Sequence, residues 1–331
     1  MARLSVVTGV FLGALTTALP WPLASARAES AIRPVRHGQE LTAAMVGPMA
    51  AGRTAGQSYP GATIRDDTRA PFLRRVDAAA SYDGFPVAGP HLLIEGVTFS
   101  GPLDIYAKLP LVLRGVSVRI EGASYWGVLT RAEAGPFFFL WSEVGGAVDA
   151  GPRAQPGKAG VQRGLYLAAP GAVVYRSHAS RSADGIQVHA SGIRVIETLI
   201  DELTTWEGEH NDGIQVIGRG ERLTVRRSRI VNPNPQTSCI LLQRGGHVIE
   251  DSYLSGGGWV IYGGATAKVP DIEAARGVRI TGTVFGQEFG ARSGTFGPIA
   301  DWDGRTTSGN VWRANRFADG RPVEPAVPVD R

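Results

Sequence analysis

DGIQVH at Asp184–His189 is followed 28 residues later by DGIQVI at Asp212–Ile217, and this repeat decides the fold. Short apolar segments recur around the two copies with an imperfect period of about 20 to 30 residues. They read LLIEGVTF from Leu92, LVLRGVSV from Leu111, AVVYRSHA from Ala172, IRVIETLI from Ile193, LTVRRSRI from Leu223, HVIEDSYL from His247, VRITGTVF from Val278 and NVWRANRF from Asn310. Short strands repeating at such a period predict a solenoid with one coil per repeat.

Two strand positions can be aligned in each coil. The first is the apolar octet, and the second comprises the two DGIQV segments, SCILLQ from Ser238 and GWVIYG from Gly258. Side chains alternate across a strand, so one face of the second position is a stacked aliphatic column that must point inward. Its members are Ile186, Val188, Ile214, Val216, Ile240, Leu242, Val260 and Tyr262. The other face places Gln187 above Gln215 and directs His189 outward.

Glycine is abundant, with 44 residues in a chain of 331. In a coil with sharp turns, glycine occupies the positive-φ positions that other residues reach at a cost. Gly185 and Gly213 occupy matching places in the two DGIQV copies, so we expect them to fill such positions.

The ends of the chain differ in composition from the repeats. Residues 1–28 have a basic start at Arg3, an apolar run and Ala26-Arg27-Ala28, which together predict a secretory signal peptide. A retained membrane anchor fits less well because Pro20 and Pro22 interrupt the run. We expect a loose leader over residues 29–76, a β-helix domain over 77–318 and a Pro-rich tail over 319–331. The protein is therefore expected to be secreted or periplasmic.

Composition narrows the class of partner. The single cysteine, Cys239, excludes an internal disulfide, and a net charge of +4 suits an acidic polymer such as a uronate-containing polysaccharide. The basic residues are scattered and no nucleic-acid-binding motif is present, so nucleic acid is not expected as a partner. We expect no membrane association after signal cleavage, and a monomer, although solenoid ends can be capped or paired with equal ease.

The stacked octets, the glycines and the paired DGIQV strands resemble right-handed parallel β-helix proteins of the pectin-lyase-like superfamily. The resemblance covers Leu92 to Phe317 and implies an all-β, right-handed parallel β-helix solenoid. That superfamily includes polysaccharide lyases, glycoside hydrolases, sugar epimerases and non-catalytic tail-spike proteins, so the resemblance leaves the reaction open.

Three branches of the superfamily can be compared with this chain. His210-Asn211-Asp212-Gly213 resembles a polygalacturonase segment, but Thr237–Cys239 and Gly257–Trp259 in the next coils lack the paired carboxylates that hydrolysis needs. Asp184–His189 has the spacing of the mannuronan epimerase strand and retains its histidine. Similarity to pectate lyases would imply a calcium site formed by Asp184, Asp212, Glu207 and Glu209. The spacing of these residues is not diagnostic of calcium binding. The cofactor therefore stays unknown, calcium being one possibility, and we assign no metal ligands.

The residues suit β-elimination at a uronate, which needs a base, an acid and a group that neutralises the carboxylate. We expect His189 and His210 to transfer protons and Arg176 to neutralise charge as the third catalytic residue. The expected substrate-binding residues are Gln187, Asn211, Gln215, Asp184, Asp212, Gln243, Trp206 and Arg163. The alternation of side chains puts Tyr262 inward, which counts against a role as proton donor.

Structural and functional alternatives remain. Gln187 and Gln215 could form an amide ladder that stabilises stacking, and His210 and Asp212 could cap a turn. The predicted activity is that of a polysaccharide lyase, a carbon–oxygen lyase of carbohydrate metabolism. The alternatives are a C5-epimerase-like enzyme, which leaves polymer length unchanged, and a non-catalytic glycan-binding or surface protein.

Overall fold

The computed structural model describes residues 34–52, 56–147, 160–204, 210–263 and 275–325. The chain divides into two units, Met1–Pro34 and Val35–Arg331, and the fold described here is that of the second. The predicted signal peptide, residues 1–28, lies outside the described residues.

Three long sheets make up the second unit, and within the described residues they contain ten, nine and ten strands. Sheet A contains β1 (Ser58–Tyr59), β7 (Thr98–Phe99), β10 (Ser117–Ile120), β13 (Glu143–Gly146), β16 (His178–Ser180), β19 (Leu199–Asp201), β22 (Arg229–Asn232), β25 (Tyr253–Gly256), β28 (Val284–Phe285) and β31 (Arg316–Phe317). Sheet B contains β2 (Ala62–Ile64), β8 (Leu103–Ile105), β11 (Ala123–Thr130), β14 (Gly160–Leu167), β17 (Ser182–Val188), β20 (Ile214–Val216), β23 (Ile240–Leu241), β26 (Trp259–Tyr262) and β29 (Gly297–Ala300). Sheet C contains β3 (Leu73–Val76), β6 (His91–Glu95), β9 (Leu111–Arg114), β12 (Phe137–Leu140), β15 (Val173–Tyr175), β18 (Arg194–Ile196), β21 (Thr224–Arg226), β24 (Val248–Glu250), β27 (Arg279–Thr281) and β30 (Val311–Arg313).

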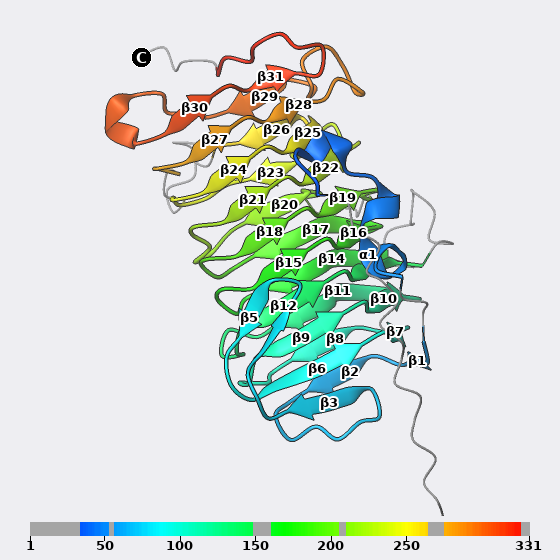
Figure 1. Ribbon diagram of the computed structural model, residues 1–331. Coiled ribbons are helices and arrows are strands. Elements are labelled where there is room, and N and C mark those ends of the chain that lie inside the picture. The colour runs from blue at the N-terminus through cyan, green and yellow to red at the C-terminus, as the bar shows by residue number, and fades with distance from the viewer. Residues whose placement is uncertain (1–33, 53–55, 148–159, 205–209, 264–274, 326–331) are drawn as a thin grey trace, which may run out of the picture. The chain divides into compact units, whose positions relative to one another are not determined.

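Successive coils visit the sheets in the order C, A, B, and neighbouring coils pair in parallel (Figure 1). The unit is therefore a parallel β-helix, as the repeats predict. The exception is β3, which pairs antiparallel with β6 at the first coil of sheet C.

Each apolar octet proved to be two short strands, not one. In LTVRRSRI, Thr224–Arg226 belongs to sheet C and Arg229–Asn232 to sheet A, with a turn at Arg227 between them. The residue at this C–A turn has a positive φ in coil after coil: Gly96, Gly115, Trp141, Arg176, Glu197, Arg227, Asp251, Gly282 and Ala314. The expectation of a single strand was wrong because the alternating pattern continues across the turn.

A buried ladder of short polar side chains follows that turn. Ser142, Ser177, Thr198, Ser228 and Ser252 are buried at matching positions. The hydroxyl of one coil accepts a hydrogen bond from the backbone N–H of the previous coil, as Ser252 Oγ does from Ser228 N at 3.3 Å. These contacts satisfy backbone donors that the bent chain cannot pair within a sheet.

The interior of sheet B follows the predicted register in its central coils. Ile186 pairs with Ile214, Gln187 with Gln215 and Val188 with Val216. The column then continues from Ile240 to Ile261, not to Val260 as expected, and Leu241 pairs with Tyr262. Tyr262 therefore belongs to the row of Gln187 and Gln215, so its assignment to the interior was wrong.

The two motif glycines are required for space, not for a positive φ. Neither Gly185 nor Gly213 is among the positive-φ residues of the described chain. A Cβ on Gly185 would lie 2.5 Å from Ile200 Cγ2, and one on Gly213 would lie 2.4 Å from Ile230 Cγ2. Both glycines thus face the interior beside the inward isoleucine that follows. Asp184 lies on the same side of β17 as Gln187, whose Nε2 donates to it.

The expected loose leader is partly ordered. Its strands β1, β2 and β3 join the three sheets, and residues 35–51 form η1 (Gly38–Glu40), η2 (Ala43–Met45) and α1 (Gly47–Ala50). This N-terminal strap runs along the C–A turns: His37 Nε2 bonds Gly282 O at 2.9 Å, Gly38 N bonds Asp251 O, and Gly47 N bonds Arg176 O. In Figure 1 it is the dark blue segment beside β25, β22, β19 and β16.

Other added segments cover sheet C and the final coil. The hairpin of β4 (Ala80–Tyr82) and β5 (Phe85–Val87) packs Val87 against Val112 and Phe138 on the outer side of sheet C. At the C-terminal end, Trp312 Nε1 donates to Val323 O at 2.6 Å and Val323 is buried, so the first part of the expected tail packs on the core. η3 (Thr306–Ser308) precedes β30.

Candidate functional site

His189 lies directly after β17, on the outer side of sheet B where the chain turns toward sheet C. Its imidazole stacks on the ring of Tyr166 from β14, with centroids 4.3 Å apart and an interplanar angle of 14°. The side chain is half-buried. The histidine is thus held by an aromatic face and stays within reach of solvent.

Hydrogen bonds determine which nitrogen of His189 carries the proton. Arg163 Nε donates to Gln187 Oε1 at 2.9 Å, which identifies that atom as the amide oxygen. His189 Nε2 lies 3.0 Å from the same oxygen and must therefore donate to it. In the neutral imidazole Nδ1 then carries the lone pair, and it faces Gly218, where a Cβ would approach to 3.2 Å.

The electrostatic environment favours that neutral form. Burial of the imidazole lowers the pKa of His189 from its ordinary value, and the charge of Arg163 lowers it further. Since an unperturbed histidine already titrates below neutral pH, His189 is unprotonated at pH 7. A neutral histidine with an available lone pair can act as a base.

Gln187 also connects His189 to the next coil. Its Nε2 donates to Gln215 Oε1 and, at 3.4 Å, to Asp184 Oδ2. Gln215 Nε2 donates in turn to Asp212 Oδ2 at 3.3 Å. The amide ladder considered from the sequence is present, and it fixes the orientation of the Gln187 oxygen that His189 uses.

Asp184 and Asp212 cap the backbone of the following coils. Asp184 Oδ1 accepts from Asp212 N at 2.9 Å, and Asp212 Oδ1 accepts from Ser238 N at 2.8 Å and Ser238 Oγ at 2.5 Å. Burial raises the pKa of Asp212, while the Ser238 hydrogen bonds oppose the rise. Both carboxylates are buried. Their hydrogen bonds to the backbone of the following coil explain why an aspartate recurs at this position in consecutive coils.

Two other expected site residues lie beside this motif. Asn211 is buried, and its backbone oxygen accepts from Asn232 Nδ2 at 2.6 Å and Thr237 Oγ1 at 2.5 Å. His210 is exposed at the start of the segment that leads into β20. Among the contacts of the described residues, none joins the His210 side chain to His189.

Arg176 is not brought to this site. It occupies the C–A turn between β15 and β16, where it is buried and donates from Nε to Glu197 Oε2 at 2.5 Å. Arg227 binds the other oxygen of Glu197, and the Arg176 guanidinium lies 5.0 Å from the Trp141 ring centroid. The expectation of Arg176 beside His189 was wrong, because the octet that carries it bends away from sheet B.

The remaining expected residues are only partly placed. Gln243 follows β23 in the turn toward sheet C, and its backbone oxygen accepts from His247 Nε2 at 2.8 Å. Trp206, Glu207 and Glu209 lie outside the described residues. Within the described ranges, no group of three or more His, Cys, Asp or Glu side chains is arranged to hold a metal ion.

Two aromatic residues were not predicted as members of the site. Tyr166 pairs in register with Gln187, and Tyr262 continues that row two strands beyond Gln215. Burial, followed by the charges of Asp212 and Asp301, raises the pKa of Tyr262, so its phenol stays protonated at neutral pH. Aligning GLYL of β14 with GIQV of β17 would have revealed Tyr166.

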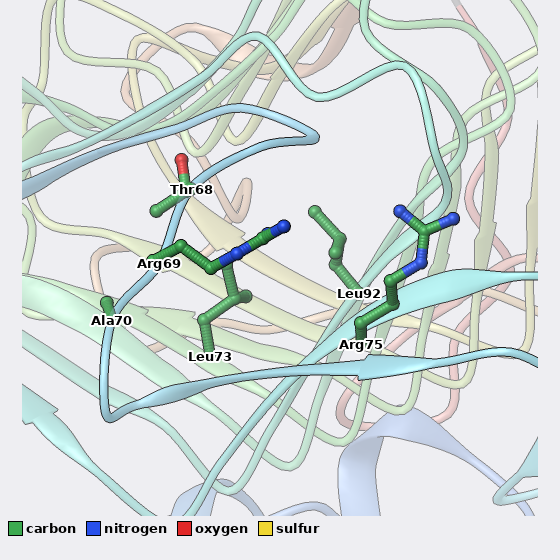
Figure 2. Close-up of a pocket in the computed structure, with 6 residues that line it drawn as sticks. All are labelled: Thr68, Arg69, Ala70, Leu73, Arg75 and Leu92. Carbon is green, nitrogen blue, oxygen red and sulfur yellow. The ribbon is translucent and has the colours of Figure 1, made fainter.

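A cavity of about 380 Å³ lies elsewhere, at the first coil. It is lined by Thr68, Arg69, Ala70, Leu73, Arg75 and Leu92, and Figure 2 shows the two arginine side chains extending over it. Arg75 forms an ion pair with Asp77, with 3.0 Å between Nε and Oδ1. None of the expected site residues lines this cavity.

No protein-family model and no curated protein sequence matches the chain. Among solved structures, it is similar to the Dettilon tailspike protein, with 17% identity, a TM-score of 0.37 and coverage of 59% of this chain and 42% of that one. It is also similar to the Agl-KA catalytic domain, with 14% identity, a TM-score of 0.31 and coverage of 68% and 41%. Each match covers less than half of the length of the other protein, so neither supports a statement about function. Among the described residues, no helix has the length and apolar character needed to cross a membrane.

Proposed function

We propose that the protein binds an acidic, uronate-containing polysaccharide on the outer face of sheet B and cleaves it by β-elimination. The observation that carries the proposal is the fixed tautomer of His189. The Nε2 proton of His189 is directed to Gln187 Oε1, burial lowers the pKa of the imidazole, and Nδ1 carries the lone pair beside Gly218, which has no side chain to cover it.

The location is supported by what covers the other two sheets. The N-terminal strap, residues 35–51, lies along the C–A turns and packs Leu41 and Val46 against Leu199 of sheet A, and the β4–β5 hairpin packs on sheet C. Sheet B presents Arg163, Tyr166 and His189 from adjacent strands, each of them half-buried, whereas Gln187 itself is buried. It is the face on which a polymer can lie.

Each step of the elimination can be assigned to a residue. Arg163 would face the uronate carboxylate, so that its positive charge stabilises the negative charge that develops when C5 loses its proton. His189 Nδ1 would take that proton, the C5 electron pair would form the C4–C5 double bond, and the bond from C4 to the leaving oxygen would break. Tyr166, stacked on His189, would protonate the leaving oxygen.

The supported site differs from the one expected from the sequence. Gln187 and Gln215 act as orienting groups within the amide ladder, and Asp184 and Asp212 as backbone caps. His210 stays a candidate for contacting substrate at the exposed start of the β20 segment. The signal pattern of residues 1–28 supports placing this activity outside the cytoplasm, in the periplasm or the medium.

Incubation of the purified protein with polygalacturonate, alginate and hyaluronate tests the proposal. Elimination creates an unsaturated uronate, so we expect rising ultraviolet absorbance together with falling chain length on one of these polymers. A changed C5 configuration with unchanged chain length would instead identify an epimerase. Retardation in polymer-containing gels without either change would identify a binding protein.

A further inference from the structure

A row of glycines follows the turns that lead from sheet B to sheet C, the B–C turns. In six consecutive coils, the residue two places before the sheet C strand has a positive φ. Backbone hydrogen bonds stack these residues from coil to coil, as Arg222 N donates to Gly245 O at 3.1 Å. The row comprises Gly171, Gly192, Arg222, Gly246, Gly277 and Gly309. Apart from Arg222, it is a strip of solvent-accessible backbone without side chains.

Arg222 occupies a glycine position in this row. Its φ is +52°, a conformation that glycine adopts freely and that a residue with a Cβ adopts at a cost. The side chain extends toward the next coil: a Cβ on Gly246 would lie 3.1 Å from Arg222 Cγ, so that glycine leaves room for the arginine. Among the described residues, none forms an ion pair or a hydrogen bond with the exposed Arg222 side chain. A strained residue whose charge pairs with no described group points to a function of its side chain.

The turn that carries Arg222 also lies beside the assigned base. Nδ1 of His189 faces Gly218, where a Cβ would approach it to 3.2 Å. Gly218 and Arg222 belong to the same B–C turn, which leads from β20 to β21. This turn stacks on the coil of His189 through the hydrogen bond from Ile217 N to Val188 O at 3.0 Å. A sugar whose proton reaches Nδ1 therefore lies over the turn that carries Arg222.

The described parts of the B–C turns after β20, β23 and β26 carry a net positive charge. They contain Arg219, Arg222, Arg244 and Arg276 and one carboxylate, that of Glu221. Arg244 holds the first of these turns, because its Nε donates to Gly218 O at 2.6 Å and its Nη1 lies 3.4 Å from Glu221 Oε1. Arg219 and Arg276 are exposed, as Arg222 is. These turns therefore favour an anionic ligand.

We propose that the glycine strip is the path of the acidic glycan beyond His189, and that Arg222 binds the carboxylate of a sugar next to the reacting one. Coils follow one another at about 4.8 Å, which is comparable to the length of one sugar unit, so a chain along the strip can present one carboxylate per coil. A guanidinium can bind a carboxylate through two parallel N–H donors. The inference rests on the proposed function and deepens it, since it gives the direction of the bound chain and a residue that selects for acidic sugars.

The Arg222→Gly variant tests this assignment, because it introduces the residue found at the five matching positions. It removes the guanidinium and relieves the strained φ. Arg181→Gly is the matched control: Arg181 also has a positive φ, of 50°, but it precedes β17 at the far end from His189 and pairs with Glu202 at 2.7 Å. Binding is measured in native gels cast with polygalacturonate, alginate or hyaluronate. We expect Arg222→Gly to bind the retarding polymer about 2- to 5-fold more weakly than the wild type, and Arg181→Gly to bind it equally well.

Two further measurements separate binding from folding. Arg222→Gly should have a Tm no lower than that of the wild type, because glycine fits the turn. Methyl esterification of the polymer should remove the difference in binding between Arg222→Gly and the wild type. A lower Tm would show that Arg222 stabilises the turn and would contradict the argument from strain.

The binding results decide the inference independently of catalysis. Equal retardation of Arg222→Gly and the wild type, or equal weakening in Arg222→Gly and Arg181→Gly, would overturn it. Retardation of the wild type without unsaturated product would remove the lyase assignment, while the two variants still decide the path of the chain. A wild type retarded by none of the polymers would contradict both proposals.

Discussion

At His189, burial and the charge of Arg163 lower the pKa in the same direction, whereas the bond to Gln187 orients the ring. Burial and Arg163 therefore control the ionisation of His189, whereas Gln187 controls the orientation of its ring. The sequence indicated an outward histidine in this row, but the choice of tautomer depends on Arg163, which lies 26 residues earlier in the chain and one strand away. Only the register of β14 with β17 brings the two together.

The Arg163→Gln variant tests the electrostatic part of this account. The base must be neutral, so elimination should decline as pH falls through the pKa of His189, which lies below the ordinary value of about 6.5. Removing the positive charge raises that pKa and should move the acidic limb of the rate profile to higher pH. The Arg226→Gln variant, which loses an exposed pair with Glu250 on sheet C, is the control. An acidic limb at the same pH in all three proteins would contradict the assignment.

Within single elements, the DGIQV strand could be predicted and the octet could not. The alternation of Ile186, Gln187 and Val188 correctly assigned inner and outer faces, because a strand of period two has one buried side. The octet conceals a turn, since residues such as Arg176 and Arg227 adopt a positive φ that their side chains do not signal. The same concealed turn explains why Arg176 was expected at the wrong place.

The motif glycines provide a test at this scale. In the Gly213→Ala variant the new methyl group would meet Ile230 Cγ2 at 2.4 Å and Cys239 O at 2.5 Å. Overpacking of this kind costs about 1–3 kcal/mol, so the free energy of unfolding should fall by that amount in urea titration. Gly84→Ala in the β4–β5 hairpin has nothing within 4 Å and serves as a control for crowding, although its φ of +84° brings strain of its own. A Gly213→Ala protein as stable as the wild type would contradict the steric explanation.

For the whole molecule, the sequence predicted the solenoid but not its coverings. Repeats reveal coils because every coil buries similar residues, whereas the N-terminal strap and the hairpin occur once and carry no period. Their positions bear on the proposed function, because they pack on sheets A and C, whereas the proposed site lies on sheet B. The composition of residues 35–51 gave no sign of this role.

The strap should stabilise the fold without taking part in the reaction. Leu41 is buried against Val35, Val46 and Leu199, so Leu41→Ala should reduce the free energy of unfolding by about 2–5 kcal/mol. Met49→Ala, on the same strap and exposed, should change it by less than about 0.5 kcal/mol. At a temperature where both variants stay folded, their elimination rates should equal that of the wild type. A selective loss of rate in Leu41→Ala would show that the strap contributes to the site.

The most direct measurement of the central claim compares elimination rates of two histidine variants on the polymer that the wild type cleaves. His189→Ala removes the assigned base, and its rate should fall by about 10²- to 10⁴-fold. His178→Ala removes a histidine paired with Asp201 at 2.7 Å on sheet A, and it should keep the wild-type rate. If His189→Ala produces unsaturated ends as fast as His178→Ala, then His189 is not the base and sheet B loses its assigned reaction centre.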